Sequence, residues 1–126
     1  MTEKRTMIYR ITEAADWHQA QRDGAFASAD LAAEGFIHCS ESHQVARTAQ
    51  KYYAGKTTLL LLEIDDSKLG AALVREDLTG SGMFPHVYEP IPLSAIHGHV
   101  DFNAAAAMDE TSIVRLFERE RQNNSS

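Results

Sequence analysis

The sequence predicts an α+β fold, and two features of its hydrophobic pattern support that prediction. Segments with apolar residues at helical spacing lie in the first half of the chain, whereas the second half consists mainly of short runs typical of strands. Strands and helices do not alternate with the repeated spacing of βαβ units, which argues against a doubly wound parallel sheet. We therefore expect two helices from the N-terminal half to pack on a sheet built from several short strands.

The chain has the size of one domain. Its 126 residues bury enough surface for a core that needs no disulfide or metal. No linker or internal repeat divides the sequence. We expect a single domain over residues 1–126, with a core in residues 7–102 and a C-terminal helix or tail in residues 104–126.

A strand and a helix open the predicted domain. Residues 7–11, Met-Ile-Tyr-Arg-Ile, have the β-branched and aromatic composition of a short strand. Thr12 is expected to cap a helix over residues 12–23, which ends at Gly24. Trp17 is expected to face the core from this helix.

A short helix and a strand follow. Residues 28–34 suit one or two helical turns, and residues 35–40, Gly-Phe-Ile-His-Cys-Ser, read as a strand opened by a glycine. Because side chains alternate along a strand, one face carries polar and aromatic groups and the other carries apolar ones. The first face holds Phe36, His38 and Ser40, and the second holds Ile37 and Cys39.

The next predicted elements are a helix and a buried strand. Ser40 or Ser42 is expected to cap the helix, which ends at Gly55. Its apolar positions recur at helical spacing: Val45, Ala46, Ala49, Tyr52 and Tyr53. Residues 57–64 form the clearest predicted strand, and the continuous run 59–62 suggests burial on both faces. We expect this strand to be central in the sheet.

The remaining strands are short. Residues 73–76 suit a strand, and residues 79–83 suit a loop. The segment 84–92 contains three prolines, which cannot donate to a strand ladder, so it is expected to be an edge strand or an extended arm. Residues 96–102 are the last predicted strand.

Charge and cysteine content exclude several functional classes. The chain carries 12 Lys and Arg against 18 Asp and Glu, a net charge of −6, which argues against a nucleic-acid partner. With one Cys and no signal-peptide pattern at its start, it is expected to be cytoplasmic. The longest apolar run, residues 59–62, is far shorter than the roughly 20 residues that span a bilayer, so no membrane partner is expected. The sequence leaves the oligomeric state open.

Two motifs combine a histidine with polar neighbours inside apolar surroundings. Residues 35–40 contain His38 two positions before a serine, and residues 84–89 contain His86 two positions before a tyrosine. On a strand each pair shares a face, so the two motifs are expected to line one pocket. The alternative for each histidine is a structural hydrogen bond to a backbone carbonyl.

Metal binding and nucleophilic catalysis are less well supported. The sequence has six histidines and one cysteine but no His-Glu-x-x-His and no paired Cys-x-x-Cys, so no metal site is expected. Cys39 lies on the opposite strand face from His38 and is expected to fill the core. Ser40 lacks a nucleophile elbow and is either a helix cap or a ligand contact.

Three charged positions leave alternatives open. Arg10 on the first strand either extends its head group to solvent or binds an anion such as phosphate. Glu89 is the candidate carboxylate, because the following proline favours an extended backbone that can direct it at a ligand; the alternative is a surface glutamate. Residues 75–77, Arg-Glu-Asp, read as a solvated charge run.

These motifs resemble those of a bacterial family known as domain of unknown function 952, which has no established activity. The resemblance covers about residues 7–102 and rests on Tyr9-Arg10-Ile11, Trp17, residues 35–40, Leu60–Asp65 and Phe84–Tyr88. The family's fold is similar to that of ADP-ribosyltransferases, in which a split, strongly bent sheet binds a nicotinamide dinucleotide between its halves. The order of elements is also similar to that of RNA 2′-phosphotransferases.

The resemblance implies a cofactor site and names NAD as the candidate cofactor. Arg10 would contact an anion, and His38 and Ser40 would contact the dinucleotide or its ribose. His86 and Tyr88 would come from the second motif, with Tyr88 stacking on an aromatic ring.

The resemblance also implies candidate catalytic residues, His38 and Glu89. Glu89 lies near the position of the superfamily's catalytic acid, although family members commonly have glycine there. An enzyme of this kind would transfer ADP-ribose or a phosphate or nucleotide group to a small molecule or protein. The alternatives are a non-enzymatic binder of a nucleotide or metabolite, and a structural module in which both histidines brace the sheet.

Overall fold

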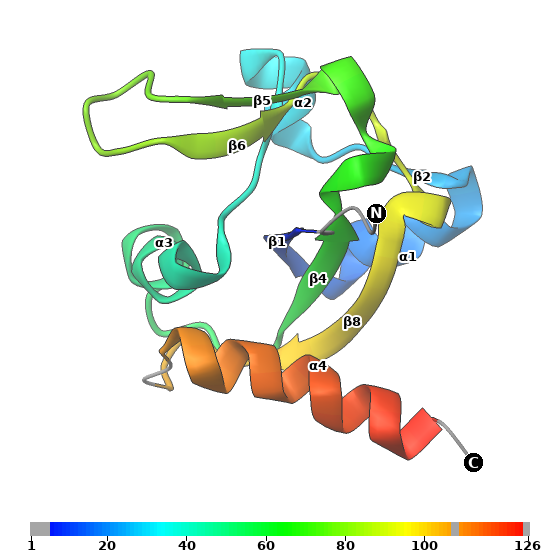
Figure 1. The fold of residues 1–126 in the computed structure, drawn as a ribbon, viewed down its shortest axis with the longest axis vertical. Helices are drawn as coiled ribbons and strands as arrows, with labels where there is room; N and C mark the ends of the chain where they lie inside the picture. Colours follow the sequence, from blue (N-terminus) through cyan, green and yellow to red (C-terminus); the bar gives the residue numbers. More distant parts are fainter. Residues whose placement is uncertain (1–5, 107–108, 125–126) are drawn as a thin grey trace, which may run out of the picture.

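The computed structural model describes residues 6–106 and 109–124, with side chains described as far as residue 118. The predicted α+β class is confirmed, because four helices pack around short antiparallel strands in this part of the chain (Figure 1). No helix among these residues is long and apolar enough to cross a membrane.

The main sheet has three strands, all antiparallel. These are β1 (Met7–Glu13), β4 (Leu59–Asp65) and β8 (Ile96–Phe102), in the order β1-β4-β8. The predicted central position of the Leu-rich strand is confirmed. Six of the seven β4 residues are buried, in keeping with a strand covered on both faces.

A second three-stranded sheet contains both histidine motifs. Its strands are β3 (Ile37–His38), β5 (Leu73–Glu76) and β6 (Phe84–Val87), in the order β3-β6-β5. A separate pair, β2 (Ala25–Phe26) and β7 (Ile91–Pro92), completes the strands.

The prediction of an edge strand over residues 84–92 was wrong for β6, which lies between two neighbours. The Pro85 carbonyl accepts a hydrogen bond from the Cys39 N–H at 3.0 Å. Because the N and O atoms of one strand residue face the same neighbour, the missing donor of Pro85 also faces the β3 side. The ladder with β5 is therefore unaffected, and a proline is tolerated in a central strand.

The helices begin and end near the predicted positions, with different caps. Helix α1 spans Ala14–Asp23 and ends at Gly24, whose φ of 83° places it in the left-handed region that favours glycine. The predicted cap Thr12 belongs to β1, because pairing with β4 continues to Glu13. Trp17 is buried as expected. Helix α2 spans Ala29–Glu34.

The cap of the next helix also differs from the prediction. A 3₁₀ turn, Ser42–Gln44, precedes α3 (Val45–Tyr52), and the Glu41 N–H donates to the Gln44 side chain. Neither Ser40 nor Ser42 caps it, since their hydroxyls bond to Thr48 and Glu110. The C-terminal segment forms α4 (Glu110–Asn124).

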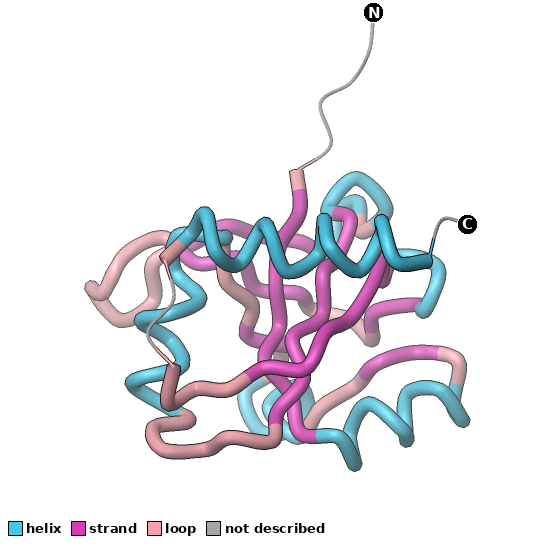
Figure 2. Tube along the Cα trace, turned by 90° about the horizontal axis from the view of Figure 1, so that it is seen from below, coloured by secondary structure: helices cyan, strands magenta, loops and turns pink. Residues whose placement is uncertain are grey.

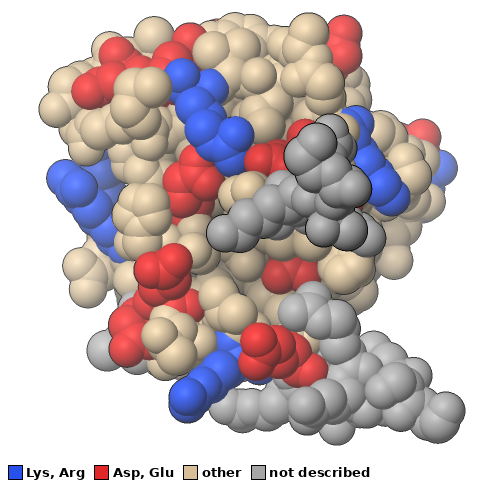
Figure 3. Space-filling model, in the orientation of Figure 1, with Lys and Arg blue, Asp and Glu red and all other residues tan. Residues whose placement is uncertain are grey.

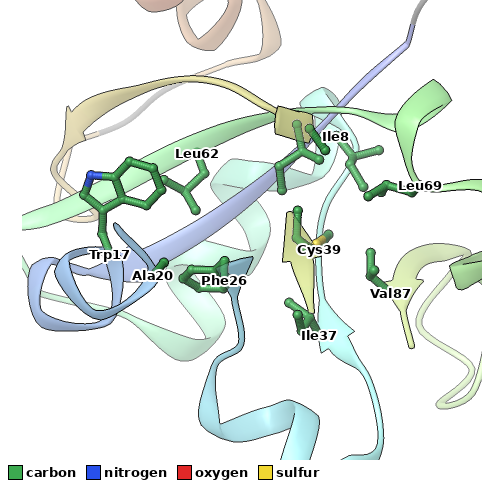
Figure 4. Packing of buried hydrophobic residues seen from close by; sticks show 12 residues of the cluster. Ile8, Trp17, Ala20, Phe26, Ile37, Cys39, Leu62, Leu69 and Val87 are labelled. Atoms are coloured by element: carbon green, nitrogen blue, oxygen red, sulfur yellow. The ribbon is translucent and has the colours of Figure 1, made fainter. Parts of the chain in front are cut away.

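The main sheet carries a hydrophobic cluster on each face. On one face, Leu62 and Ile64 pack with Trp17 of α1 and with Ile37 and Val87 of the second sheet (Figure 4). On the other face, residues from the sheet meet α3 and α4: Tyr9, Ile11, Leu59, Leu61, Val100 and Phe102 contact Val45, Ala49, Ile113 and Phe117. Figure 2 shows α4 crossing these strands. The two clusters hold the second sheet and α3 in fixed positions around β1.

Substitution of Leu61 by Ala should destabilise the protein strongly. Leu61 is fully buried in the middle of β4, so truncation leaves a cavity that costs about 2–5 kcal/mol. The matched control is Leu78→Ala, because Leu78 is 58% exposed and should change the free energy of unfolding by less than about 0.5 kcal/mol. Urea unfolding monitored by circular dichroism compares the two; equal losses would contradict the assignment of β4 as the central strand.

Candidate functional site

A cavity of about 390 Å³ opens beside β1, between α2, α3 and the β5–β6 hairpin. Its lining is rich in aromatic rings: Tyr9, Phe36, His38, Tyr52, Tyr53, Phe84 and His86. Cavities of this size and apolar character are typical of small-molecule sites. Both predicted histidines therefore belong to one candidate site.

Antiparallel pairing of β3 with β6 places the two histidine motifs side by side in the second sheet. His38 on β3 lies directly opposite His86 on β6, and their ring centroids are 5.2 Å apart. Phe36 stacks on the His86 ring at 4.1 Å, and Phe84 lies 5.3 Å from His38. The alternation predicted for residues 35–40 is confirmed, because Ile37 and Cys39 are buried in the core while the intervening residues line the cavity.

Arg10 of β1 bonds to the backbone of β3 at the point where the two strands separate and the cavity begins. Tyr9 and Ser40 form an isolated antiparallel bridge, with both N–H···O distances at 2.8 Å. One residue further along β1, Arg10 Nη1 donates to the His38 carbonyl oxygen at 2.8 Å and to Asp30 Oδ2 at 2.7 Å. The same Asp30 oxygen accepts the His38 N–H at 2.9 Å. Side chains thus replace the backbone pairing that would otherwise continue from the bridge.

The ionised state of Asp30 supports this arrangement. Burial alone would raise the pKa of the Asp30 carboxyl, but the Arg10 guanidinium, the His38 N–H and the Ser28 hydroxyl together lower it below its usual value. Arg10 lines the cavity while its Nη1 is bonded to protein groups, and its buried Nε has no hydrogen-bond partner among the described residues. Anion binding by Arg10 stays a prediction.

His38 is a neutral imidazole at physiological pH. Burial, followed by the nearby His86 and Arg10, lowers the pKa of His38 to about 4. Its backbone N–H and carbonyl are both engaged by the Arg10–Asp30 pair. A neutral ring beside the cavity offers one donor and one acceptor to a ligand.

Glu76 is a site residue that the sequence analysis missed. His86 Nδ1 lies 2.9 Å from Glu76 Oε1, and the Tyr88 hydroxyl donates to the same oxygen. These hydrogen bonds, that of Tyr88 first, lower the pKa of Glu76. The prediction of a solvated charge run over residues 75–77 is wrong for Glu76, which pairs with Phe84 across the hairpin and so shares a strand face with His86. Side-chain alternation along β5 and β6 could have indicated that Glu76 and His86 share a face. That inference needs the register between the two strands, which the sequence does not give.

The predicted site residues separate into two groups. Arg10, His38, Ser40 and His86 line the cavity. The Ser40 hydroxyl lies 3.0 Å from the Thr48 hydroxyl of α3. Tyr88 and Glu89 are exposed and are not among the lining residues, since they follow the end of β6. Tyr88 contacts two lining residues, Glu76 through its hydroxyl and Phe36 through its ring, with the two ring centroids 5.5 Å apart.

The remaining titratable candidates lie outside this arrangement. Cys39 is buried in the core, and burial raises the pKa of its thiol to about 12, as expected of a structural cysteine. Within the described segments no three His, Cys, Asp or Glu side chains are grouped to hold a metal ion.

Two cationic side chains of α3 stand at the rim of the cavity. Arg47 and Lys51 are one helical turn apart and both line it. Neither forms an ion pair with a carboxylate in the described part of the chain, whereas Arg10 is paired with Asp30. Arg47 and Lys51 therefore offer positive charge to a ligand beside the aromatic rings, and the lining also includes the carboxylates of Asp30, Glu34 and Glu76.

Comparisons with known proteins agree with the proposed relationship. The fold is similar to that of protein CC0527 from Caulobacter crescentus: the crystal structure is 38% identical, with a TM-score of 0.71 over 76% of this chain and 85% of that one. Its solution NMR structure is 33% identical, with a TM-score of 0.69 over 90% and 95% of the two chains. No curated protein sequence matches significantly. Residues 11–99 match the model described as "Protein of unknown function (DUF952)", and the chain therefore belongs to this family.

Proposed function

We propose that the cavity binds a small nucleotide, with NAD as the first candidate, and that it serves ADP-ribosyl or phosphate transfer to a small molecule or protein. The observation that carries the proposal is an aromatic cavity with a cationic rim. Flat rings bind between aromatic side chains, and phosphates bind beside Lys and Arg. A nucleotide combines both kinds of group.

Different lining residues would contact the ring and the phosphate ends of such a ligand. His38 and Phe84 provide ring surfaces for a base or a nicotinamide. Arg47 and Lys51 provide charge for a phosphate or diphosphate. The neutral His38 imidazole is suited to a hydrogen bond with a ribose hydroxyl.

The arrangement of the sheets supports an ADP-ribosyltransferase-like fold as part of the proposal. Two three-stranded sheets meet at the Tyr9–Ser40 bridge, and the cavity lies where they separate. This is the position expected for a dinucleotide in a split sheet.

Charge favours a small ligand over a polynucleotide. The net charge is −6, and the face drawn in Figure 3 intersperses Lys and Arg with Asp and Glu. A nucleic-acid surface needs a continuous basic region to neutralise phosphates.

A non-enzymatic nucleotide or metabolite binder is the second candidate function. It is favoured by the positions of the carboxylates: Glu89 does not line the cavity, and one oxygen of Glu76 already accepts from His86 and Tyr88. Transfer through a cationic sugar centre needs a carboxylate that faces the ligand. Turnover measurements separate the two candidates.

Titration calorimetry with NAD and AMP should detect binding to the wild-type protein, and His38→Ala should abolish it. The His38 ring lines the cavity and makes no hydrogen bond to a described residue, so the variant should keep its fold. His43→Ala is the matched control, because His43 is exposed and does not line this cavity.

Arg47→Glu should weaken AMP binding by about tenfold or more through loss of a charged contact. Absence of binding at millimolar concentration would contradict the proposal.

The stability of the protein should depend on pH through His38. In the folded protein the pKa of His38 is about 4, below the ordinary 6.5, so the unfolded chain binds more protons between these values. The contribution is complete above pH 6.5 and is lost as pH falls toward 4.

Urea unfolding at pH 7.5 and pH 5 measures this effect. Wild-type protein should lose about 1 kcal/mol more stability than His38→Gln over this interval, after allowance for the partial exposure of the ring. His43→Gln serves as control and should behave as wild type. An equal loss in wild type and His38→Gln would show that His38 is not held neutral.

A further inference from the structure

A carboxylate, a histidine and a tyrosine form a connected group on one side of the cavity. Glu76 Oε1 lies 2.9 Å from His86 Nδ1 and accepts the Tyr88 hydroxyl. His86 is only 4% exposed and lines the cavity, whereas Tyr88 is 41% exposed and does not. The three residues come from β5, from β6 and from the position directly after β6.

The charge of Glu76 determines which nitrogen of His86 carries a proton. Hydrogen bonds from Tyr88 and His86 lower the pKa of Glu76, so its carboxylate is ionised at neutral pH and can only accept. His86 Nδ1 must therefore be the donor. In the neutral ring the lone pair is then on Nε2.

Nε2 is the second ring nitrogen of His86. It has no hydrogen-bond partner among the described residues. Because His86 lines the cavity and its Nδ1 is held by Glu76, Nε2 is the ring nitrogen that a bound ligand could contact.

We propose that His86 is the general base of this site and that Glu76 is its positioning residue. An acceptor hydroxyl or a water molecule held in the cavity loses its proton to His86 Nε2. The O–H bond breaks and the Nε2–H bond forms, while the oxygen would bond to the ribose C1′ of NAD and nicotinamide would leave with the electrons of the C1′–N bond. The ionised Glu76 stabilises the resulting imidazolium. This inference rests on the proposed nucleotide function and assigns a general base to the transfer reaction.

The neighbours of His86 suit this role. Phe36 stacks on the ring at 4.1 Å and restricts its rotation. His38, with centroid 5.2 Å away, has a pKa of about 4, so it stays neutral and does not compete for the proton. Glu76 is the carboxylate bonded directly to the ring.

The first test examines the ligand-free protein. Two-bond ¹H–¹⁵N correlation spectra at a pH where His86 is neutral should show the proton on Nδ1. Glu76→Gln should move it toward Nε2, and Glu89→Gln, an exposed neighbouring carboxylate, should leave it on Nδ1. A proton on Nε2 in wild type, or no change in Glu76→Gln, would overturn the positioning role without any reference to a ligand.

The second test measures nicotinamide release from NAD by the full chain, together with calorimetric binding of NAD. His86→Asn should lower the rate by about 100-fold or more, and Glu76→Gln by about tenfold or more, with NAD affinity nearly unchanged. Glu76→Gln keeps the inference testable if His86→Asn does not fold. Binding without release in wild type would overturn the base role and leave nucleotide binding intact. Absence of binding would overturn both.

Discussion

The cavity depends on the interruption of one backbone ladder by a salt bridge. Tyr9 and Ser40 bond through their backbones, and simple continuation of that pairing would place Ile11 opposite His38. Instead the guanidinium of Arg10 and the carboxylate of Asp30 occupy the hydrogen-bonding groups of His38. Because these bonds satisfy the backbone N–H and carbonyl of His38, β3 can diverge from β1 without a buried unpaired carbonyl. The space that opens between them is the site.

The two hydrophobic clusters give this opening a rigid frame. One holds the second sheet against the main sheet through Ile37 and Val87, and the other holds α3 through Val45 and Ala49. The helix that presents the cationic rim and the hairpin that presents His86 and Glu76 are thus anchored from opposite faces of β4. A ligand would meet walls that are already in position, which reduces the ordering cost of binding.

Much of the fold was predictable because burial follows simple periods. The period-two pattern of residues 35–40 correctly divided core from cavity, and the apolar run of residues 59–62 correctly indicated a central strand. Helix caps were less predictable, since Thr12 lies in β1 through its pairing with β4. The central position of β6 was also missed, because it depends on pairing with strands elsewhere in the chain. Pro85 is tolerated there only because its missing donor faces the β3 side.

Of the candidate site, the sequence by itself determined that His38 and Ser40 share a strand face, and it singled out Arg10 and His86; all four residues line the cavity. Tertiary structure decided what each of them contacts. The strand register brought Glu76 beside His86 and left Glu89 exposed, and α2 supplied Asp30 as the partner of Arg10. Alternation is a local property of the backbone, whereas register and helix placement arise from contacts between residues far apart in the chain.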